Sequence, residues 1–332
     1  MAETVNRAQM AEDLASKIFA EFLWQTTGPM NENWPCEQQE IHGTKSHPTD
    51  VVFYYDEPYS NVRRYIQCDL KSYSKDSIKS ASIKSALFSL AEQVSCADIS
   101  ETWQNRYAHP STSFEVSGLL FVYNHDRDFH KPFDSLISDI RAEDIRLRQK
   151  LRLYVLGPEE INWLQRVARE IQQMRGDDDD DKRLPARQYC AFFYPQLVRN
   201  AVVRSEHARA ATMEMLKSPW IIMEYFNEDG ARQGFVIFHR RKTTLEGLMY
   251  LLDYMRQHEL IANKTRIDIK VQPDDGEARQ NLQKAIQEYL AFIPGENHHT
   301  DLAKRLSKIK ISHVPEILTS YSTVEMGMNY AG

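Results

Sequence analysis

The sequence predicts a mixed α/β protein with two domains. Segments with helical apolar spacing alternate with short apolar runs of strand length. A length of 332 residues corresponds to about two domains. Five consecutive aspartates, Asp177 to Asp181, interrupt the chain near its middle, and such a run repels itself and stays solvated. We therefore expect domains at 1–175 and 185–332, joined by an acidic linker at 176–184.

The first domain is predicted to contain a helix, a three-stranded meander, a second helix and a further strand. Met10, Leu14, Ile18 and Phe22 recur every four residues and indicate a helix over 8–25, ended by Gly28-Pro29. The remaining elements are expected as strands at 36–41, 51–55 and 63–70, a helix at 77–95, strands at 118–123 and 151–156, and helices at 134–149 and 158–174.

The second domain is also predicted to be α/β. Two apolar runs flank Asn227-Glu228-Asp229-Gly230, which is typical of a hairpin turn. Its elements are expected as helices at 195–216, 244–258, 277–291 and 300–307, and strands at 220–226, 234–238, 266–271 and 309–313.

The cysteines and the apolar content constrain the compartment. Cys36, Cys68, Cys96 and Cys190 are scattered without a CxxC pair, a spacing that predicts neither a zinc site nor a disulfide framework. The N-terminus has no signal-peptide core, and the chain has no run of about 18 apolar residues. We expect a cytoplasmic protein without a membrane span, and the absence of GxxxxGK[ST] argues against a P-loop ATPase.

Net charge is −6, yet the charge is unevenly distributed. Residues 1–182 hold 21 Lys/Arg and 30 Asp/Glu, a net of −9, whereas residues 183–332 hold 20 and 17, a net of +3. Basic residues also cluster between 62 and 84. Because a phosphate backbone is bound by local clusters of positive charge, the negative total does not exclude a nucleic-acid ligand.

The most informative residues lie at the ends of two predicted strands. Asp50 opens the apolar run 51–55, and Asp69 and Lys71 close the run that begins at Tyr65. Alternate residues of a strand share a face, so Asp69 and Lys71 project together. If the two runs pair as an antiparallel hairpin, both carboxylates and the ammonium meet at one sheet edge. Such a group suits a divalent metal and a positioned water.

The order of elements and these residues together resemble the PD-(D/E)XK, or restriction-endonuclease-like, nuclease superfamily over roughly residues 8–125. The resemblance rests on Pro48-Thr49-Asp50 and on Asp69-Leu70-Lys71. Two departures are Thr49, which separates the proline from the aspartate, and Asp69, which stands where glutamate is commoner.

The resemblance implies a site for Mg²⁺ or Mn²⁺. Asp50, Asp69 and the Leu70 carbonyl would be ligands, and Lys71 would act beside the attacking water. Glu21 on the first helix would complete the catalytic set, with Glu40 as a competing candidate. Gln67, on the strand face of Asp69, is a further candidate for contact with water or phosphate. The competing interpretation is a surface salt bridge between Asp69 and Lys71, worth about 0–1 kcal/mol.

The predicted function is metal-dependent endonucleolytic cleavage of DNA. The resemblance further permits a homodimer or a complex with a partner subunit, and a role in bacterial defence against phage or foreign DNA. Two alternatives stay open: a non-cleaving DNA-binding or scaffold subunit, and a protein-binding adaptor. Candidate DNA-backbone contacts are the following basic residues: Arg63, Arg64, Lys75, Lys79, Arg240, Arg241 and Lys242.

Overall fold

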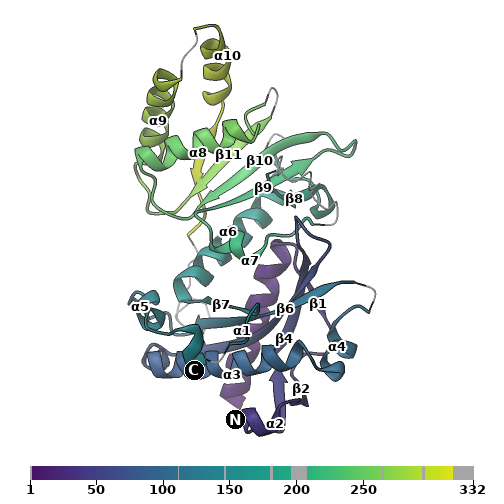
Figure 1. Cartoon of the computed structure of the whole chain (residues 1–332). Coiled ribbons are helices and arrows are strands. Elements are labelled where there is room, and N and C mark those ends of the chain that lie inside the picture. The colour runs from purple at the N-terminus through teal and green to yellow at the C-terminus, as the bar shows by residue number, and fades with distance from the viewer. Residues whose placement is uncertain are drawn as a thin grey trace, which may run out of the picture.

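A computed structural model shows two five-stranded sheets, one in each half of the chain. It describes residues 2–110, 112–145, 147–179, 182–195, 208–262, 265–293 and 296–316. The two sheets lie at opposite ends of the molecule, with helix α6 running between them (Figure 1).

The first half confirms the predicted order of helix, meander, helix and strand. Its sheet has the order β1-β4-β5-β6-β7. Strands β1, β4 and β5 are antiparallel neighbours, and β6 and β7 add in parallel to β5. The elements are α1 (Ala2–Glu21), β1 (Gln25–Thr27), β2 (Glu32–Pro35), α2 (Gln39–His42), β3 (Ser46–Thr49), β4 (Val51–Asp56), β5 (Arg63–Tyr73), α3 (Ser80–Ala97), α4 (Glu101–Tyr107), β6 (Phe114–Asn124), α5 (Asp134–Ile137), β7 (Arg152–Leu156) and α6 (Pro158–Arg175).

Helices cover both faces of this sheet. Alternate residues of β5 divide between the faces: Ile66, Cys68 and Leu70 pack with α1 and α6. Tyr65 packs instead with α3 and α4. This alternation is that of a strand buried on both sides, and it places Gln67, Asp69 and Lys71 on the α3 face.

The second half is a mixed sheet of order β12-β11-β10-β9-β8. Strands β9 and β10 form the predicted hairpin, and β11 and β12 follow in parallel through helical crossovers. Its elements are β8 (Cys190–Phe192), α7 (Met213–Lys217), β9 (Trp220–Phe226), β10 (Arg232–His239), α8 (Leu245–Gln257), β11 (Arg266–Val271), α9 (Ala278–Phe292), α10 (Glu296–Leu306) and β12 (Lys310–His313).

The two sheets share an apolar core through α6. Leu164, Val167 and Ile171 of α6 belong to the same buried cluster as Phe53 of the first sheet and Phe238 of the second. The connection after α6 is tied back to the core, since the buried Leu184 donates its N–H to the Met174 carbonyl. The acidic segment thus separates the two sheets along the chain, while their apolar surfaces stay joined.

The end of the first helix and the first strand of the meander are predicted in the wrong position. The first helix ends at Glu21 rather than at 25, because Leu23 takes a left-handed backbone conformation (φ 64°) and turns the chain into β1. The predicted strand at 36–41 does not form: Ile41 is 64% exposed, and 39–42 is helical. The short strand β1 takes its place and pairs with β4.

One predicted helix is largely absent, and the described part of another is helical only at its end, in α7. The segment 134–149 contains only α5 and a 3₁₀ turn at Ala142–Ile145, with residue 146 outside the described part. Of the helix predicted at 195–216, residues 196–207 lie outside the described residues, and 208–212 are non-helical. Buried Ala208, Ala210 and Ala211 show that this stretch packs into the core as irregular chain.

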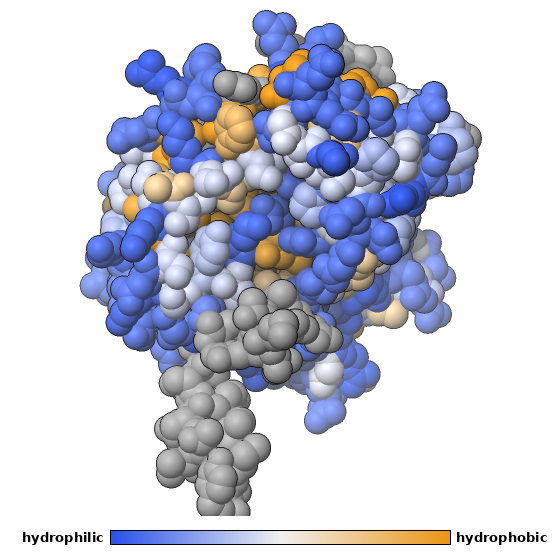
Figure 2. Space-filling view, turned by 90° about the horizontal axis from the view of Figure 1, so that it is seen from below, coloured by the Kyte–Doolittle hydropathy of each residue, from blue (hydrophilic) through white to orange (hydrophobic). Residues whose placement is uncertain are grey.

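The surface is mainly polar at the end of the molecule formed by the first sheet. Seen from that end, hydrophilic side chains cover most of the visible face, with hydrophobic areas between them (Figure 2). None of the helices that the structure describes is long and apolar enough to cross a lipid bilayer.

Candidate active site

The register of β4 and β5 places Asp50 opposite Asp69. The strands are antiparallel, and Val51, the first residue of β4, pairs with Cys68. Continued by one position beyond this last pair, the register brings Asp50 opposite Asp69. Side chains of directly opposite residues share one face, with Cβ atoms about 5 Å apart. The two carboxylates therefore meet on the α3 face, as the predicted hairpin requires.

The main chain of Leu70 holds Asp50 in this place. The Leu70 N–H donates to Asp50 Oδ2 over 2.6 Å. In a strand, the N–H and C=O of one residue point to the same neighbouring strand. The Leu70 carbonyl therefore points toward the side on which Asp50 lies. The Asp50 carbonyl in turn accepts from the N–H of Asn31 at 3.0 Å.

Lys71 completes the group from the same face of β5. Its Nζ lies 2.6 Å from Asp69 Oδ1. The Lys71 side chain is 34% exposed, whereas that of Asp69 is 8% exposed. The ammonium is thus open to solvent, and to a ligand, from the position where it neutralises a nearly buried carboxylate.

The two carboxylates are costly to ionise here. Burial raises the pKa of Asp50 from 3.8 to about 6; the Leu70 N–H opposes this rise, and the Asp69 carboxylate adds to it. Burial also raises the pKa of Asp69, against the opposing effect of Lys71. Burial alone would lower the pKa of Lys71, but its contact with Asp69 raises it above the ordinary value. Lys71 is therefore an ammonium at neutral pH.

A further carboxylate reaches this site from α1. Glu12 is close enough to contribute to the raised pKa of Asp50. Its Oε2 accepts from Asn31 Nδ2 at 3.3 Å, and Asn31 is the residue whose N–H binds the Asp50 carbonyl. The sequence pattern did not single out Glu12, although a signal exists: it precedes the buried Ala15 and Phe19 by three and seven residues, so it borders the apolar stripe.

The comparisons with known proteins address the same part of the chain. Residues 1–160 match the family model described as the GAPS4 protein PD-(D/E)XK nuclease domain. This part of the chain is a PD-(D/E)XK nuclease domain. No curated protein matches the chain. The resemblance that the sequence suggested is thus confirmed, and the match extends through β7 to the first turn of α6.

The donor set of the nuclease domain fits a divalent metal. PD-(D/E)XK nucleases usually use divalent metals. Here Asp50 and Asp69 offer hard carboxylate oxygens, and the Leu70 carbonyl points toward the same side. Burial raises the pKa of each carboxylate, and the nearby Asp69 adds to the rise at Asp50. A bound cation would remove this unfavourable interaction, which favours a metal over a simple ion pair.

The structure contradicts the expectation for Glu21. Its carboxylate is bound by Arg175 at 2.5 Å, by Arg187 at 2.8 Å and by Gln172 at 3.2 Å. It stands nine residues after Glu12 on α1, about 13 Å along the helix axis. Glu21 therefore joins α1 to α6 and the chain after it, and Glu12 is the glutamate of α1 that lies near Asp50.

Gln67 and Glu40, the other two candidates, also lie away from the site at Asp50 and Asp69. Gln67 is fully buried, and its amide group binds Thr49, Gln93 and Trp103. It supports β3, α3 and α4 from within the core and has no exposed surface for water or phosphate. Glu40 lies in the exposed helix α2, because the strand predicted around it does not form.

The basic residues of β5 divide by their distance from the site. Arg63 and Arg64 begin the strand, and Arg63 lies six residues, or about 20 Å, before Asp69. The prediction for Arg64 is wrong: it is 4% exposed and its guanidinium binds Glu57, Ser117 and Glu115. Arg63 is paired with Asp56 at 2.8 Å.

Lys75 and Lys79 lie at the same end of β5 as Lys71. Lys75 follows the strand and is paired with Asp128 at 3.1 Å, and Lys79 directly precedes α3. Both side chains are exposed. Of the predicted DNA contacts in the nuclease domain, these two are exposed and follow Lys71 by four and eight residues.

The basic triplet of the second half faces a polar cavity beside α6. Arg240, Arg241 and Lys242 line a cavity of about 770 Å³ together with Arg166 and Lys217. Arg240 is 3.3 Å from Glu160, and Lys242 is 2.9 Å from Asp274. Arg241 and Lys242 are exposed and accessible to a phosphate backbone.

Proposed function

We propose that this chain is a Mg²⁺-dependent DNA endonuclease. One observation carries the proposal: the carboxylates of Asp50 and Asp69 lie beside each other, with Lys71 on the strand face of Asp69. The nuclease domain match over residues 1–160 supports hydrolysis of phosphodiester bonds as the chemistry. Mn²⁺ has the same preference for oxygen ligands and is expected to substitute.

The roles of the residues follow from their protonation states. Asp50 and Asp69 would hold the metal ion with the Leu70 carbonyl, and the ion would lower the pKa of a bound water and neutralise charge on the phosphate. Lys71 is an ammonium at neutral pH, so it acts as an electrostatic group rather than as a base. It would orient the attacking water and stabilise the extra negative charge of the transition state. Glu12 would supply a further negative charge beside Asp50.

The biological setting that we propose is defence against phage or foreign DNA. The matching family carries the name of GAPS4, which is an antiphage defence protein. One active site cuts one strand, so a double-strand break requires two copies of the chain or a partner subunit. The second half, with its positive excess and the basic triplet 240–242, would contact the DNA backbone or that partner.

Cleavage of circular DNA tests the activity directly. The purified chain is incubated with supercoiled, linear and single-stranded DNA, with Mg²⁺ or with EDTA. Nicked or linear products from the supercoiled circle, formed only with the metal, indicate an endonuclease. Asp69→Asn is the matched variant and is expected to leave the circle intact. DNA that is bound but uncut by the wild-type chain under every metal condition would support a non-cleaving subunit instead.

A further inference from the structure

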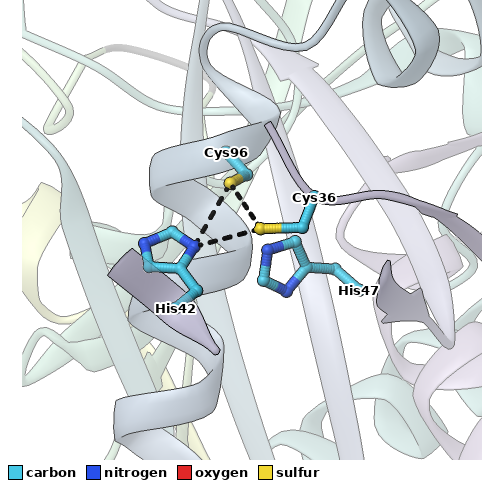
Figure 3. A group of neighbouring side chains, drawn as sticks. All are labelled: Cys36, His42, His47 and Cys96. Carbon is cyan, nitrogen blue, oxygen red and sulfur yellow. Dashed lines mark hydrogen bonds between the residues drawn. The ribbon is translucent and has the colours of Figure 1, made fainter. Parts of the chain in front are cut away.

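Two cysteines and two histidines from separate segments meet beside α3. Cys36 follows β2, His42 ends α2, His47 lies in β3, and Cys96 is near the end of α3. One ligand atom from each residue lies within 4.8 Å of all the others. Figure 3 shows the four side chains pointing toward one another.

The distances within this cluster match those around a tetrahedral ion. The sulfurs of Cys36 and Cys96 are 3.7 Å apart, and His42 Nδ1 is 3.4 Å from each of them. Zinc bonds of about 2.3 Å to sulfur and about 2.0 Å to nitrogen, at tetrahedral angles, separate two sulfurs by about 3.8 Å and a sulfur from a nitrogen by about 3.5 Å. The one sulfur–sulfur and two sulfur–nitrogen distances therefore already match three edges of a zinc tetrahedron.

His47 occupies the fourth corner of the tetrahedron, and its ligand atom has no hydrogen-bond partner among the described residues. This atom is Nε2, and His47 is 2% exposed. The ring is fixed by Trp34 on one side, with centroids 5.0 Å apart, and by His42 on another, at 5.5 Å. Its Nε2 is turned toward the two sulfurs (Figure 3). A buried ring nitrogen without a partner is costly, and a metal ion would satisfy it.

The chain between Cys36 and His47 buries little of its surface. Cys36 and His47 are buried, but none of the residues 37–46 between them is. Outside the cluster, the contacts of this segment include two hydrogen bonds: the Ser100 hydroxyl donates to Glu37 at 2.7 Å, and the Cys36 N–H donates to the Lys45 carbonyl at 3.0 Å. A segment with so little apolar burial is commonly held by a metal or a disulfide. The same segment leads directly into Asp50, three residues after His47.

We propose that Cys36, His42, His47 and Cys96 form a structural zinc site of Cys₂His₂ type. All four corners are filled by protein, which distinguishes a structural site from a catalytic one. Binding of Zn²⁺ by two thiols and two neutral imidazoles forms four metal–ligand bonds and releases two protons. The ion would fix the segment 36–47 onto α3 and thereby set the position of β3 and Asp50. It is distinct from the oxygen-ligand site at Asp50 and Asp69.

The spacing of the cysteines predicted no zinc site, because that prediction considered only cysteines that are close in sequence. Cys36 and Cys96 are 60 residues apart in sequence, yet their sulfurs are in contact. The fold supplies the pairing that a local CxxC motif would otherwise supply.

Metal content of the purified full-length chain tests the proposal. After growth with added zinc and isolation under reducing conditions, we expect about one zinc ion per chain by elemental analysis. Cys96→Ser should reduce this at least about tenfold, whereas Cys190→Ser, which changes a buried free thiol outside the cluster, should retain it. Asp50→Asn should also retain it, because Asp50 belongs to the other site.

A second measurement does not depend on a folded variant. The wild-type chain reconstituted with Co²⁺ should show the visible d–d bands of a tetrahedral ion and sulfur-to-cobalt charge transfer. A weak octahedral spectrum, a zinc-free wild-type chain, or equal zinc in Cys96→Ser and wild type would each overturn the assignment. So would a Cys36–Cys96 disulfide found by mass spectrometry in protein isolated with its thiols blocked.

Discussion

Leu70 holds Asp50 through its main chain, with the Leu70 N–H donating to Asp50 Oδ2 over 2.6 Å. The contact is made by the residue between Asp69 and Lys71, so one short piece of β5 positions three components of the site. Because the donor is a backbone group, no substitution of the Leu70 side chain other than proline removes it. Substitutions that test the site therefore have to be made at the side chains of Asp50, Asp69 and Lys71.

Lys71→Ala should reduce cleavage by about 10²–10³ while DNA affinity changes little. The ammonium faces the site from the strand face of Asp69 and would stabilise charge that develops only in the transition state. Single-turnover kinetics measures the reduction. Lys84→Ala is the matched control, because Lys84 is exposed on α3 and paired with Asp144 at 3.7 Å. A Lys71 variant within twofold of wild type would exclude this role for the residue.

Asp50→Asn should stabilise the metal-free chain above about pH 6. The folded-state pKa of about 6 lies above the ordinary 3.8, so the folded protein loses stability as pH rises between these values. The substitution removes that loss, which amounts to at most about 3 kcal/mol. Urea unfolding in EDTA, at about pH 4 and about pH 7.5, measures the difference.

The low-pH measurement is the internal control, since position 50 of the folded protein is then neutral in both chains. Addition of Mn²⁺ at neutral pH should raise the melting temperature of the wild type and not that of Asp50→Asn. A variant that is less stable than wild type without metal, or that gains the full metal shift, would place the metal elsewhere.

Glu12→Gln and Glu21→Gln should have opposite effects. Glu12 lies near Asp50, so its loss should weaken metal-dependent cleavage and leave the melting temperature nearly unchanged. Glu21 accepts from Arg175 and Arg187, so its neutralisation should destabilise the fold by about 1–3 kcal/mol and leave cleavage per folded molecule intact. Melting curves and cleavage rates for both variants separate the two roles. Loss of cleavage in a stable Glu21→Gln chain would show that Glu21 does contribute to the active site.

Neutralising basic residues should weaken DNA binding in proportion to the number of phosphates that those residues bind. Lys75 and Lys79 form one set, and Arg240, Arg241 and Lys242 form the other. Each phosphate contact removed should reduce the slope of log K against log salt by about 0.9 on duplex DNA. Alanine at Lys75 and Lys79 together should therefore lower the slope by about 1.8.

Alanine at Arg240, Arg241 and Lys242 together should also lower the slope of log K against log salt. Cleavage at saturating DNA should survive, because the metal site lies in the other half. Arg63→Ala is the control at the far end of β5. An unchanged slope for the triplet would assign the second half to a partner subunit.

The local sequence pattern was sufficient to predict the strands that form the site. The apolar runs after Asp50 and before Asp69 have the length and composition of buried strands, and both form as predicted. Their polar ends meet because an antiparallel pair with this register brings position 50 opposite 69. The same pattern misplaced the first strand of the meander, because short β1 has three residues and no buried one. Its position is set by pairing with β4, not by its own composition.

Contacts between distant segments could not be predicted in the same way. Glu12 and Glu21 both border the apolar stripe of α1, and only the packing of α6 assigns Glu21 to two arginines. Arg64 has the sequence appearance of an exposed cation, yet the neighbouring strand and turn bury it. Which charges remain exposed depends on partners far along the chain.

The sequence by itself determined the α/β class and most strands of the nuclease core, and it singled out Asp50, Asp69 and Lys71 as the candidate site. These follow from periodicity and from neighbours a few positions away, which a linear pattern records. The tertiary structure alone decided the register that joins the carboxylates, the partners of Glu12 and Glu21, and the meeting of Cys36 with Cys96 across 60 residues. The physical reason is that these contacts depend on how buried faces pack together, and packing brings together residues whose separation in sequence carries no periodic signal.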